Sequence, residues 1–565
     1  MQAYKKYLAA LLAVGILFRI YSALNTPVIN TDEILYMVIA AGTSTSTWAR
    51  LSTLLHGPLY FYLTDFAFNF LGHASFSARL VSVVFGGASI VLVYLLGAEL
   101  YEKKTALVAA ALFAVSAAAS TLGVLALFDP LVSTFLLLAA FLLLRHMRSG
   151  SRKELAGSLA ALALAINTKV IALYFVPALA VLFIASKARV EPRKAAVPLL
   201  LFLLLLLPIP AYNYFMYSSK GLLDLHFTSV LGLGQPEEWL AQKTLVGQRK
   251  WDVGESLREN LAEVPAAVFG FYSIPFLLLA VVGIAAAVSA RGRAGIFMLA
   301  WVFAYLLFFL LYIFHSYYIL YLAPAFALLA AAGMMELLKR IGEKNRRIAF
   351  AGMLLLVAVG ELAAAAGVMH GKDATYQLQE RIQVLPENSI VLLDDAIWKG
   401  EKAWIGVSGR QDVMSLSEFY DLQKSLEGTA ARTPYDVYYV RCVLGDCGAK
   451  EMENASVKAS EAMNSQLSQQ GQPALEIYEG KEKRYAVYEL SVEGYLFGRK
   501  GRIFMNYDIG HPERSVDVYE THGPVEAGLD AIAHASLWVN LLLALAAPLF
   551  AFSFLVRAGS GEYFE

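Results

Sequence analysis

The sequence predicts a polytopic α-helical membrane protein of about twelve transmembrane helices, with a small α/β domain near the C-terminus. Hydrophobic residues make up 58% of the 565 residues and charged residues only 16%, whereas a soluble domain carries about 25% charged residues. The mean hydropathy is +0.55. Apolar runs of span length recur along the chain, and residues 370–529 form one sizeable polar block. No basic stripe is present, which argues against a nucleic-acid partner.

A membrane-spanning helix requires about 20 mostly apolar residues. Lys5 and Lys6 precede the first such run, and no small-residue cleavage site follows it, so we expect a membrane anchor and not a cleaved signal peptide. The predicted spans are residues 7–24, 75–98, 104–121, 129–146, 153–168, 169–187, 194–216, 264–289, 295–314, 316–338, 348–369 and 530–556.

The loops between these spans alternate in charge. Cations gather in every second loop, and cytoplasmic loops carry an excess of Lys and Arg. We therefore expect a multi-pass protein of the cell membrane whose N-terminus lies in the cytoplasm. The cation-rich loops are 101–104, 145–153, 186–194, 290–293 and 339–347. The segments expected on the outer side are 25–74, 121–129, 217–263 and 370–529.

The polar block 370–529 predicts a small extracytoplasmic α/β domain. Residues 389–395, 435–442 and 484–490 are typical of strands, and residues 451–470 of a helix. The two cysteines, Cys442 and Cys447, lie within it, and a disulfide would suit an oxidising compartment, although the sequence alone does not establish one. Asn454 begins a glycosylation sequon. The chain thus divides into a transmembrane domain 1–369, the α/β domain 370–529 and a C-terminal helix and tail 530–565.

Three carboxylates occur at the outer ends of predicted spans. Asp32 and Glu33 follow the first span, and Asp129 precedes Pro130 at the start of another. Each has a structural interpretation as a helix N-terminal residue, because acidic side chains there accept backbone N–H groups and suit the helix dipole. Each also has a chemical one. Asp32 and Asp129 could face one pocket, as a general base or as ligands of a divalent metal such as Mg, Mn or Zn.

Two cations lie on the side where Lys and Arg are disfavoured. Arg79 and Lys169 either extend to the headgroups or bind a phosphate, and a lipid-linked phosphate would lie at this depth. His56 and His315 are expected on the same side, as hydrogen-bonding groups or as ligands. Tyr60 and Tyr318 belong either to an interfacial aromatic belt or to a sugar-binding surface. The loop 217–263 is either a lid or an amphipathic helix on the membrane.

Five segments in a fixed order resemble the integral-membrane glycosyltransferases of the GT-C superfamily. They are "NTDEILYMVIAAG" (30–42), "HGPLYFYL" (56–63), "ARLVSVVFGG" (78–87), "LALFDPLVSTFLLLAAFLLL" (125–144) and "LAINTKVIALYFVPAL" (164–179). The protein O-mannosyltransferase-like branch and the lipid A aminoarabinose transferases are the most similar. The similarity covers residues 1–210, and residues 300–335, which contain "HSYYILYLAPAFALLAAAG", more weakly.

The resemblance implies a polyprenyl- or dolichyl-phosphate-linked sugar donor and transfer to an acceptor hydroxyl of a protein, lipid or glycan on the outer face. It makes Asp32 the essential acid of the first outer loop, with Glu33 beside it. It matches Asp129 to the Asp of the family's "LDP"-like motif and Lys169 to the family's Lys in a "TK" pair. His56 stands where the aminoarabinose transferases have a Lys. Asp32 would accept the acceptor proton, and Lys169 with Arg79 would stabilise the leaving phosphate.

A transporter or flippase for a lipid or glycolipid is the main alternative. Transporters place ionisable groups near the bilayer midplane and often contain inverted repeats. Here the ionisable residues cluster at the outer ends of spans, and no repeat is visible in the sequence. This distribution favours an enzyme.

Overall fold

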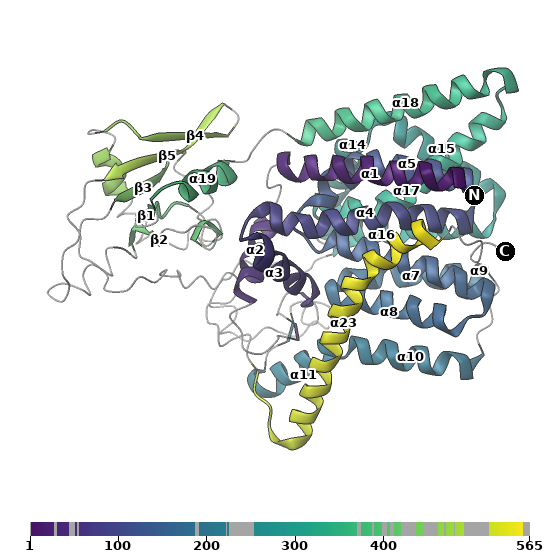
Figure 1. Ribbon diagram of the computed structural model, residues 1–565, viewed down its shortest axis with the longest axis horizontal. Coiled ribbons are helices and arrows are strands. Elements are labelled where there is room, and N and C mark those ends of the chain that lie inside the picture. The colour runs from purple at the N-terminus through teal and green to yellow at the C-terminus, as the bar shows by residue number, and fades with distance from the viewer. Residues whose placement is uncertain are drawn as a thin grey trace.

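The computed structural model has a bundle of long helices at one end and a small sheet at the other (Figure 1). The parts of the chain that it describes are residues 2–26, 31–43, 51–52, 56–186, 191–221, 223–224, 253–312, 314–369, 374–386, 389–397, 404–406, 412–417, 419, 436–444, 447, 461–467, 471–479, 481–490 and 519–557.

Most predicted spans correspond to helices. The helices of the first half are α1 (Gln2–Asn25), α2 (Thr31–Thr43), α3 (Leu59–Leu71), α4 (Ser75–Leu100), α5 (Lys103–Val115), α6 (Ala117–Thr121), η1 (Leu122–Val124), α7 (Asp129–Ser149), α8 (Arg152–Thr168), η2 (Val170–Phe175), α9 (Val176–Ala185), α10 (Pro192–Leu206) and α11 (Pro208–Lys220). Those of the second half are α14 (Val253–Phe271), α15 (Ile274–Ala290), α16 (Arg293–Leu311), η3 (Ser316–Leu322), α17 (Ala323–Lys339), α18 (Glu343–Val368), α19 (Ala374–Gln383) and α23 (Gly523–Arg557).

Fewer helices qualify as single spans than the twelve predicted. Seven described helices are long and apolar enough to cross a membrane, and ten if each bent helix pair counts as one span. The predicted span 264–289 is wrong as a single helix, because α14 and α15 meet at an angle of 113°. Ser273 caps α15 by accepting a hydrogen bond from the Phe276 amide, and Pro275 follows in its first turn. Two further pairs bend, α5 with α6 and α10 with α11.

The sheet has five strands in the order β2-β1-β3-β5-β4. Their bounds are β1 (Ile390–Leu393), β2 (Asp412–Ser415), β3 (Val437–Cys442), β4 (Leu475–Glu479) and β5 (Glu482–Leu490). β1 pairs in parallel with β2 and β3, while β5 runs antiparallel to β3 and β4. The three predicted strands are present. The sequence reading missed β2 and β4, which are short and lie at the two edges.

Only part of the predicted helix 451–470 falls in the described chain, where residues 461–467 are helical. Cys442 and Cys447 form a disulfide with a Cα–Cα distance of 6.1 Å, which agrees with the alternative that the sequence left open. The sequon at Asn454 lies outside the described residues, as does most of the loop 217–263, for which the sequence left a lid and an amphipathic helix open.

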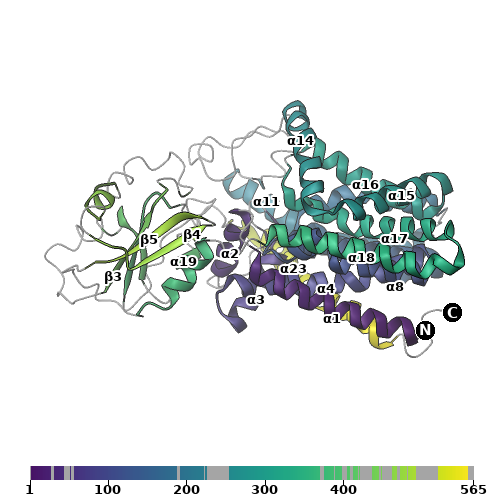
Figure 2. The same ribbon diagram turned by 90° about the horizontal axis from the view of Figure 1, so that it is seen from above.

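The sheet stands beside α2 and α3, at one end of the bundle (Figures 1 and 2). Trp404 connects the two parts. Its side chain is 2% exposed, its ring lies 5.9 Å from that of Phe68 on α3, and its indole N–H donates to Gln379 on α19. In both views α1 begins, and α23 ends, at the end of the bundle away from the sheet. α2 and α3 therefore lie between the helix bundle and the sheet.

Candidate active site

The two adjacent acids at the start of α2 have different surroundings. Residues next to each other on a helix point about 100° apart. Asp32 is half-buried, and its Oδ2 accepts a 2.7 Å hydrogen bond from the hydroxyl of Tyr317. Glu33 is fully buried and faces Arg79. The two carboxylates consequently cannot perform the same task.

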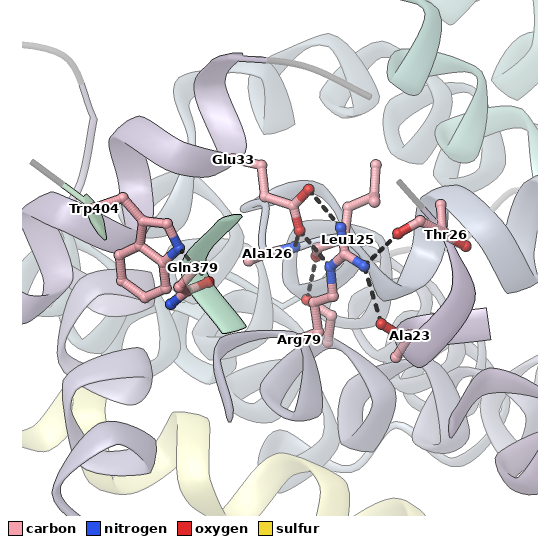
Figure 3. Close-up of polar contacts among 9 residues, drawn as sticks. Ala23, Thr26, Glu33, Arg79, Leu125, Ala126, Gln379 and Trp404 are labelled. Atoms are coloured by element: carbon pink, nitrogen blue, oxygen red, sulfur yellow. Dashed lines mark hydrogen bonds and ion pairs between the residues drawn. The ribbon is translucent and has the colours of Figure 1, made fainter. Parts of the chain in front are cut away.

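Glu33 and Arg79 form a bidentate ion pair. The Arg79 Nε and Nη2 atoms lie 2.6 and 2.9 Å from the two carboxylate oxygens of Glu33. Arg79 Nη1 donates to the backbone carbonyls of Ala23 and Thr26, and the Ala126 amide donates to Glu33 at 2.8 Å. Figure 3 shows this arrangement between the end of α1 and the segment before α7. A buried charge is tolerated only with such a complete set of partners, so these contacts fix the start of α2 against α1 and α4.

Asp129 and Lys169 form a second buried ion pair. The Lys169 ammonium lies 3.1 and 3.2 Å from the two Asp129 carboxylate oxygens. Tyr321 donates to Asp129 Oδ1 at 2.7 Å. Asp129 is the first residue of α7, with Pro130 after it, and Lys169 follows the last residue of α8. The two ends of the α7–α8 helix pair thus place an acid and a cation in contact.

The 3₁₀ segment η3 connects Asp32 to this ion pair. Tyr317 donates its hydroxyl to Asp32, while the Lys169 ammonium lies 5.1 Å from the centre of the Tyr317 ring and 4.7 Å from that of Tyr318. His315 is half-buried and stacks on Tyr317 at 5.2 Å. Burial lowers the pKa of the His315 imidazole, and the Asp32 carboxylate opposes that shift. Five residues therefore lie together at one location: Asp32, Lys169, His315, Tyr317 and Tyr318.

His56 and Tyr60 lie in an aromatic cluster with Tyr36 and Phe128. His56 Nε2 is 2.9 Å from the Tyr36 hydroxyl, and the rings of His56, Tyr60 and Tyr36 all contact Phe128. Tyr60 is fully buried. The structure thus places His56 and Tyr60 among aromatic side chains and not at an open surface. Burial raises the pKa of the Tyr36 phenol, and the Asp32 carboxylate adds to this shift.

Gly57 brings this cluster close to Lys169. A Cβ atom at Gly57 would lie 1.7 Å from the backbone oxygen of Asn167, so only glycine allows the chain to pass here. Asn167 is held in turn by its side-chain amide, which donates to the Leu205 carbonyl at 2.7 Å. The loop before α3 and the last turn of α8 are consequently in direct contact, two residues before Lys169.

The predicted divalent metal has no evident ligand set in the described part of the chain. No group of three His, Cys, Asp or Glu side chains is close enough to hold an ion there. Both oxygens of Asp129 face the Lys169 ammonium, so Asp32 and Asp129 do not fit a metal in this arrangement. The metal remains a prediction.

Sequence reasoning did not predict that the hydroxyls of Tyr317 and Tyr321 contact the acids. Their signal was the run "HSYYILYL" (315–322), which is equally typical of an interfacial aromatic belt. It also missed the pairing of Arg79 with Glu33, because 46 residues separate them.

Residues 55–212, from the loop before α3 into α11, match the family model described as dolichyl-phosphate-mannose-protein mannosyltransferase. The match contains Arg79, Asp129 and Lys169. No curated protein matches the sequence.

Similar solved structures are those of ArnT from Cupriavidus metallidurans. The apo form has 14% sequence identity and a TM-score of 0.58, and the match covers 86% of this chain and 98% of that chain. The form bound to undecaprenyl phosphate has 13% identity and a TM-score of 0.55, with the same coverage. An oligosaccharyltransferase from Archaeoglobus fulgidus also matches, over 77% of this chain and 69% of that chain, with 13% identity and a TM-score of 0.48.

The fold defines a class: this is a polytopic membrane protein with a small sheet domain at one end of its bundle. The resemblance to the GT-C glycosyltransferases, and the predicted fold class with it, is confirmed at the level of the fold.

Proposed function

We propose that the protein transfers a sugar from a polyprenyl- or dolichyl-phosphate donor to an acceptor hydroxyl, at the end of the bundle next to the sheet. The observation that carries this proposal is Tyr317, whose hydroxyl contacts Asp32 and whose ring contacts Lys169. One side chain thus touches both a candidate base and a candidate phosphate-binding cation. The mannosyltransferase family model over residues 55–212 supports the reaction class, and ArnT, whose fold this chain shares, has been crystallised with undecaprenyl phosphate.

The proposed reaction is a single displacement at the anomeric carbon of the sugar. The acceptor oxygen forms a bond to this carbon as the bond to the phosphate oxygen breaks, and the lipid phosphate leaves with the electron pair. Asp32 accepts the proton of the acceptor hydroxyl. It suits this role because it is half-buried and therefore reachable by an acceptor. Inversion at the anomeric carbon follows from a single displacement.

Lys169 would stabilise the negative charge on the leaving phosphate. An ammonium has three N–H donors. The contacts of the Lys169 ammonium to the two Asp129 carboxylate oxygens engage two of these donors. Asp129 and Tyr321 would hold the ammonium in place, which makes Asp129 a partner of the cation and not a second base. His315 and Tyr318 flank the same position and are the best candidates for contacts to the sugar.

Glu33 and Arg79 are assigned a structural role, since each satisfies the charge of the other. Arg79 is then not a phosphate ligand. His56 and Tyr60 are assigned to packing behind the site.

We further propose that 1–369 is the catalytic domain, that 370–529 is an extracytoplasmic domain, and that 530–565 returns the chain across the cell membrane. The opposite positions of the start of α1 and of the sheet support this topology.

The test uses a radiolabelled polyprenyl-phosphate sugar and the purified full-length protein in detergent. Release or transfer of the labelled sugar is expected from the unaltered chain, and Asp32→Asn is expected to lose it. Movement of intact donor across vesicles without release would instead identify a flippase. Undiminished sugar release by Asp32→Asn would contradict the assignment of the base.

A further inference from the structure

The helix pair α5–α6 is broken at Ser116, next to the candidate site. α5 ends at Val115, α6 begins at Ala117, and the pair bends by 58°. Such a break releases the last carbonyls of one helix and the first N–H groups of the next. Between packed membrane helices these groups need partners from the protein itself. Two charged residues supply them.

Arg19 of α1 binds the carbonyl side of the break. The Arg19 side chain is fully buried, and its Nη1 and Nη2 atoms lie 3.2 and 3.5 Å from the carbonyl oxygens of Ala114 and Phe113. Gly86 of α4 leaves the room for it, because a Cβ atom there would lie 2.9 Å from Arg19 Nε. A cation therefore faces the C-terminal, negative end of α5.

Glu361 of α18 binds the N–H side of the same break. It is fully buried, and its Oε2 accepts a 2.7 Å hydrogen bond from the Ala117 amide, the first residue of α6. Its Oε1 accepts a 2.8 Å hydrogen bond from the Ser273 amide, at the 113° break between α14 and α15. One carboxylate thus faces the positive ends of two helices.

Both breaks lead directly to groups of the candidate site. The segment after Ala117 continues through η1 to Ala126, whose amide donates to Glu33, and then to Asp129. At the second break, Tyr272 donates its hydroxyl to the Ile319 carbonyl at 3.2 Å. Ile319 lies in η3 between the two tyrosines that contact the acids.

We propose that Arg19 and Glu361 are positioning residues for this transfer site. Arg19 and Glu361 hold the α5–α6 break from opposite sides, and Glu361 also holds the α14–α15 break. Through these breaks they position the segment that ends at Asp129 and the η3 segment that contacts Asp32. This inference rests on the proposed function. Arg19 and Glu361 are charged residues in apolar helices. Within the part of the chain that the structure describes, neither contacts Asp32, Asp129 or Lys169, and the inference assigns them a role.

The experiment compares Glu361→Gln, Arg19→Gln and Arg19→Lys with the full-length unaltered chain. Glu343→Gln is the matched control. It makes the same chemical change in the same helix, but Glu343 is exposed and lies in the first turn of α18. Three kinds of measurement are made on the monodisperse fraction. They are kcat and KM for a polyprenyl-phosphate sugar, hydrogen–deuterium exchange of peptides covering 117–126, and thermal unfolding.

For Glu361→Gln and Arg19→Gln we expect kcat per folded molecule to fall about ten- to a hundredfold, since small displacements of reacting groups have effects of this size. KM should change by less than about twofold, because the donor itself is not contacted. Exchange over 117–126 should accelerate in both. Arg19→Lys retains a cation for the carbonyls and should keep most of the kcat, and Glu343→Gln should match the unaltered chain in every respect.

A lower unfolding temperature with unchanged kcat per folded molecule would overturn the proposal, as would unchanged exchange over 117–126. Should Glu361→Gln fail to fold, the comparison of Arg19→Gln with Arg19→Lys decides the same question with Glu361 intact. If the unaltered chain shows no turnover, the proposed function is contradicted. The support of the helix break by Arg19 and Glu361 is still tested, because the exchange measurement needs no donor.

Discussion

Lys169 and Asp129 form a buried ion pair although 40 residues separate them in the chain. Their side chains are 2% and 1% exposed. Two charges so far from water are stabilising only together, because either one alone would be buried without compensation. The pair therefore fixes the relative positions of the start of α7 and the end of α8, and it holds the cation beside Tyr317 and Tyr318.

Breaking this pair should cost stability whichever partner is changed. We expect Asp129→Asn and Lys169→Gln each to destabilise the protein by about 3–5 kcal/mol, the usual effect of leaving one buried charge unpaired. The double variant should be less destabilised than the sum of the two, because it leaves no charge behind. Thermal unfolding in detergent provides the measurement. Additive losses would show that the two side chains do not interact.

The adjacent acids of α2 should respond differently to the loss of charge. Asp32→Asn keeps an oxygen that can accept from Tyr317, so its unfolding temperature should stay close to that of the unaltered chain, while sugar transfer falls by about 10²–10⁴. Glu33→Gln leaves Arg79 without its counter-charge and should lose about 3–5 kcal/mol of stability. Both are assayed for transfer and for thermal unfolding. The opposite pattern would exchange the roles assigned to the two residues.

These roles were only partly predictable from the sequence. Asp32, Asp129 and Lys169 could be singled out because charged residues at the outer ends of spans are unusual, and the resemblance to GT-C enzymes selects the same positions. The pairing of Glu33 with Arg79 was not predictable, since nothing local links residues on α2 and α4. The break at Ser116 was also invisible, because "AVSAAAS" (114–120) contains no proline and reads as a continuous helix. The two charged residues that bind its two sides, Arg19 and Glu361, come from distant helices.

Tyr317→Phe separates the two contacts of that side chain. It removes the hydroxyl that donates to Asp32 and keeps the ring beside Lys169. A hydrogen bond to a charged group contributes about 1.5–3 kcal/mol, so we expect kcat to fall about ten- to a hundredfold while KM for the donor changes little. Tyr305→Phe is the control: its hydroxyl has no hydrogen-bond partner among the described residues and its ring stacks on Tyr321. Equal activity of the two variants would remove Tyr317 from the mechanism.

Gly57→Ala should damage the site without changing any charged group. The added Cβ would lie 1.7 Å from the Asn167 backbone oxygen, a contact that only a shift of the backbone can relieve. Because Asn167 is anchored to Leu205, the strain should displace either the loop carrying His56 or the residues leading to Lys169. Overpacking of this kind costs about 1–3 kcal/mol or more, and we expect a lower unfolding temperature together with weaker donor binding. Gly270→Ala is the matched control, since a Cβ there meets nothing within 4 Å. If both substitutions behave alike in unfolding and in the KM for the donor, close contact at Gly57 does not position Lys169.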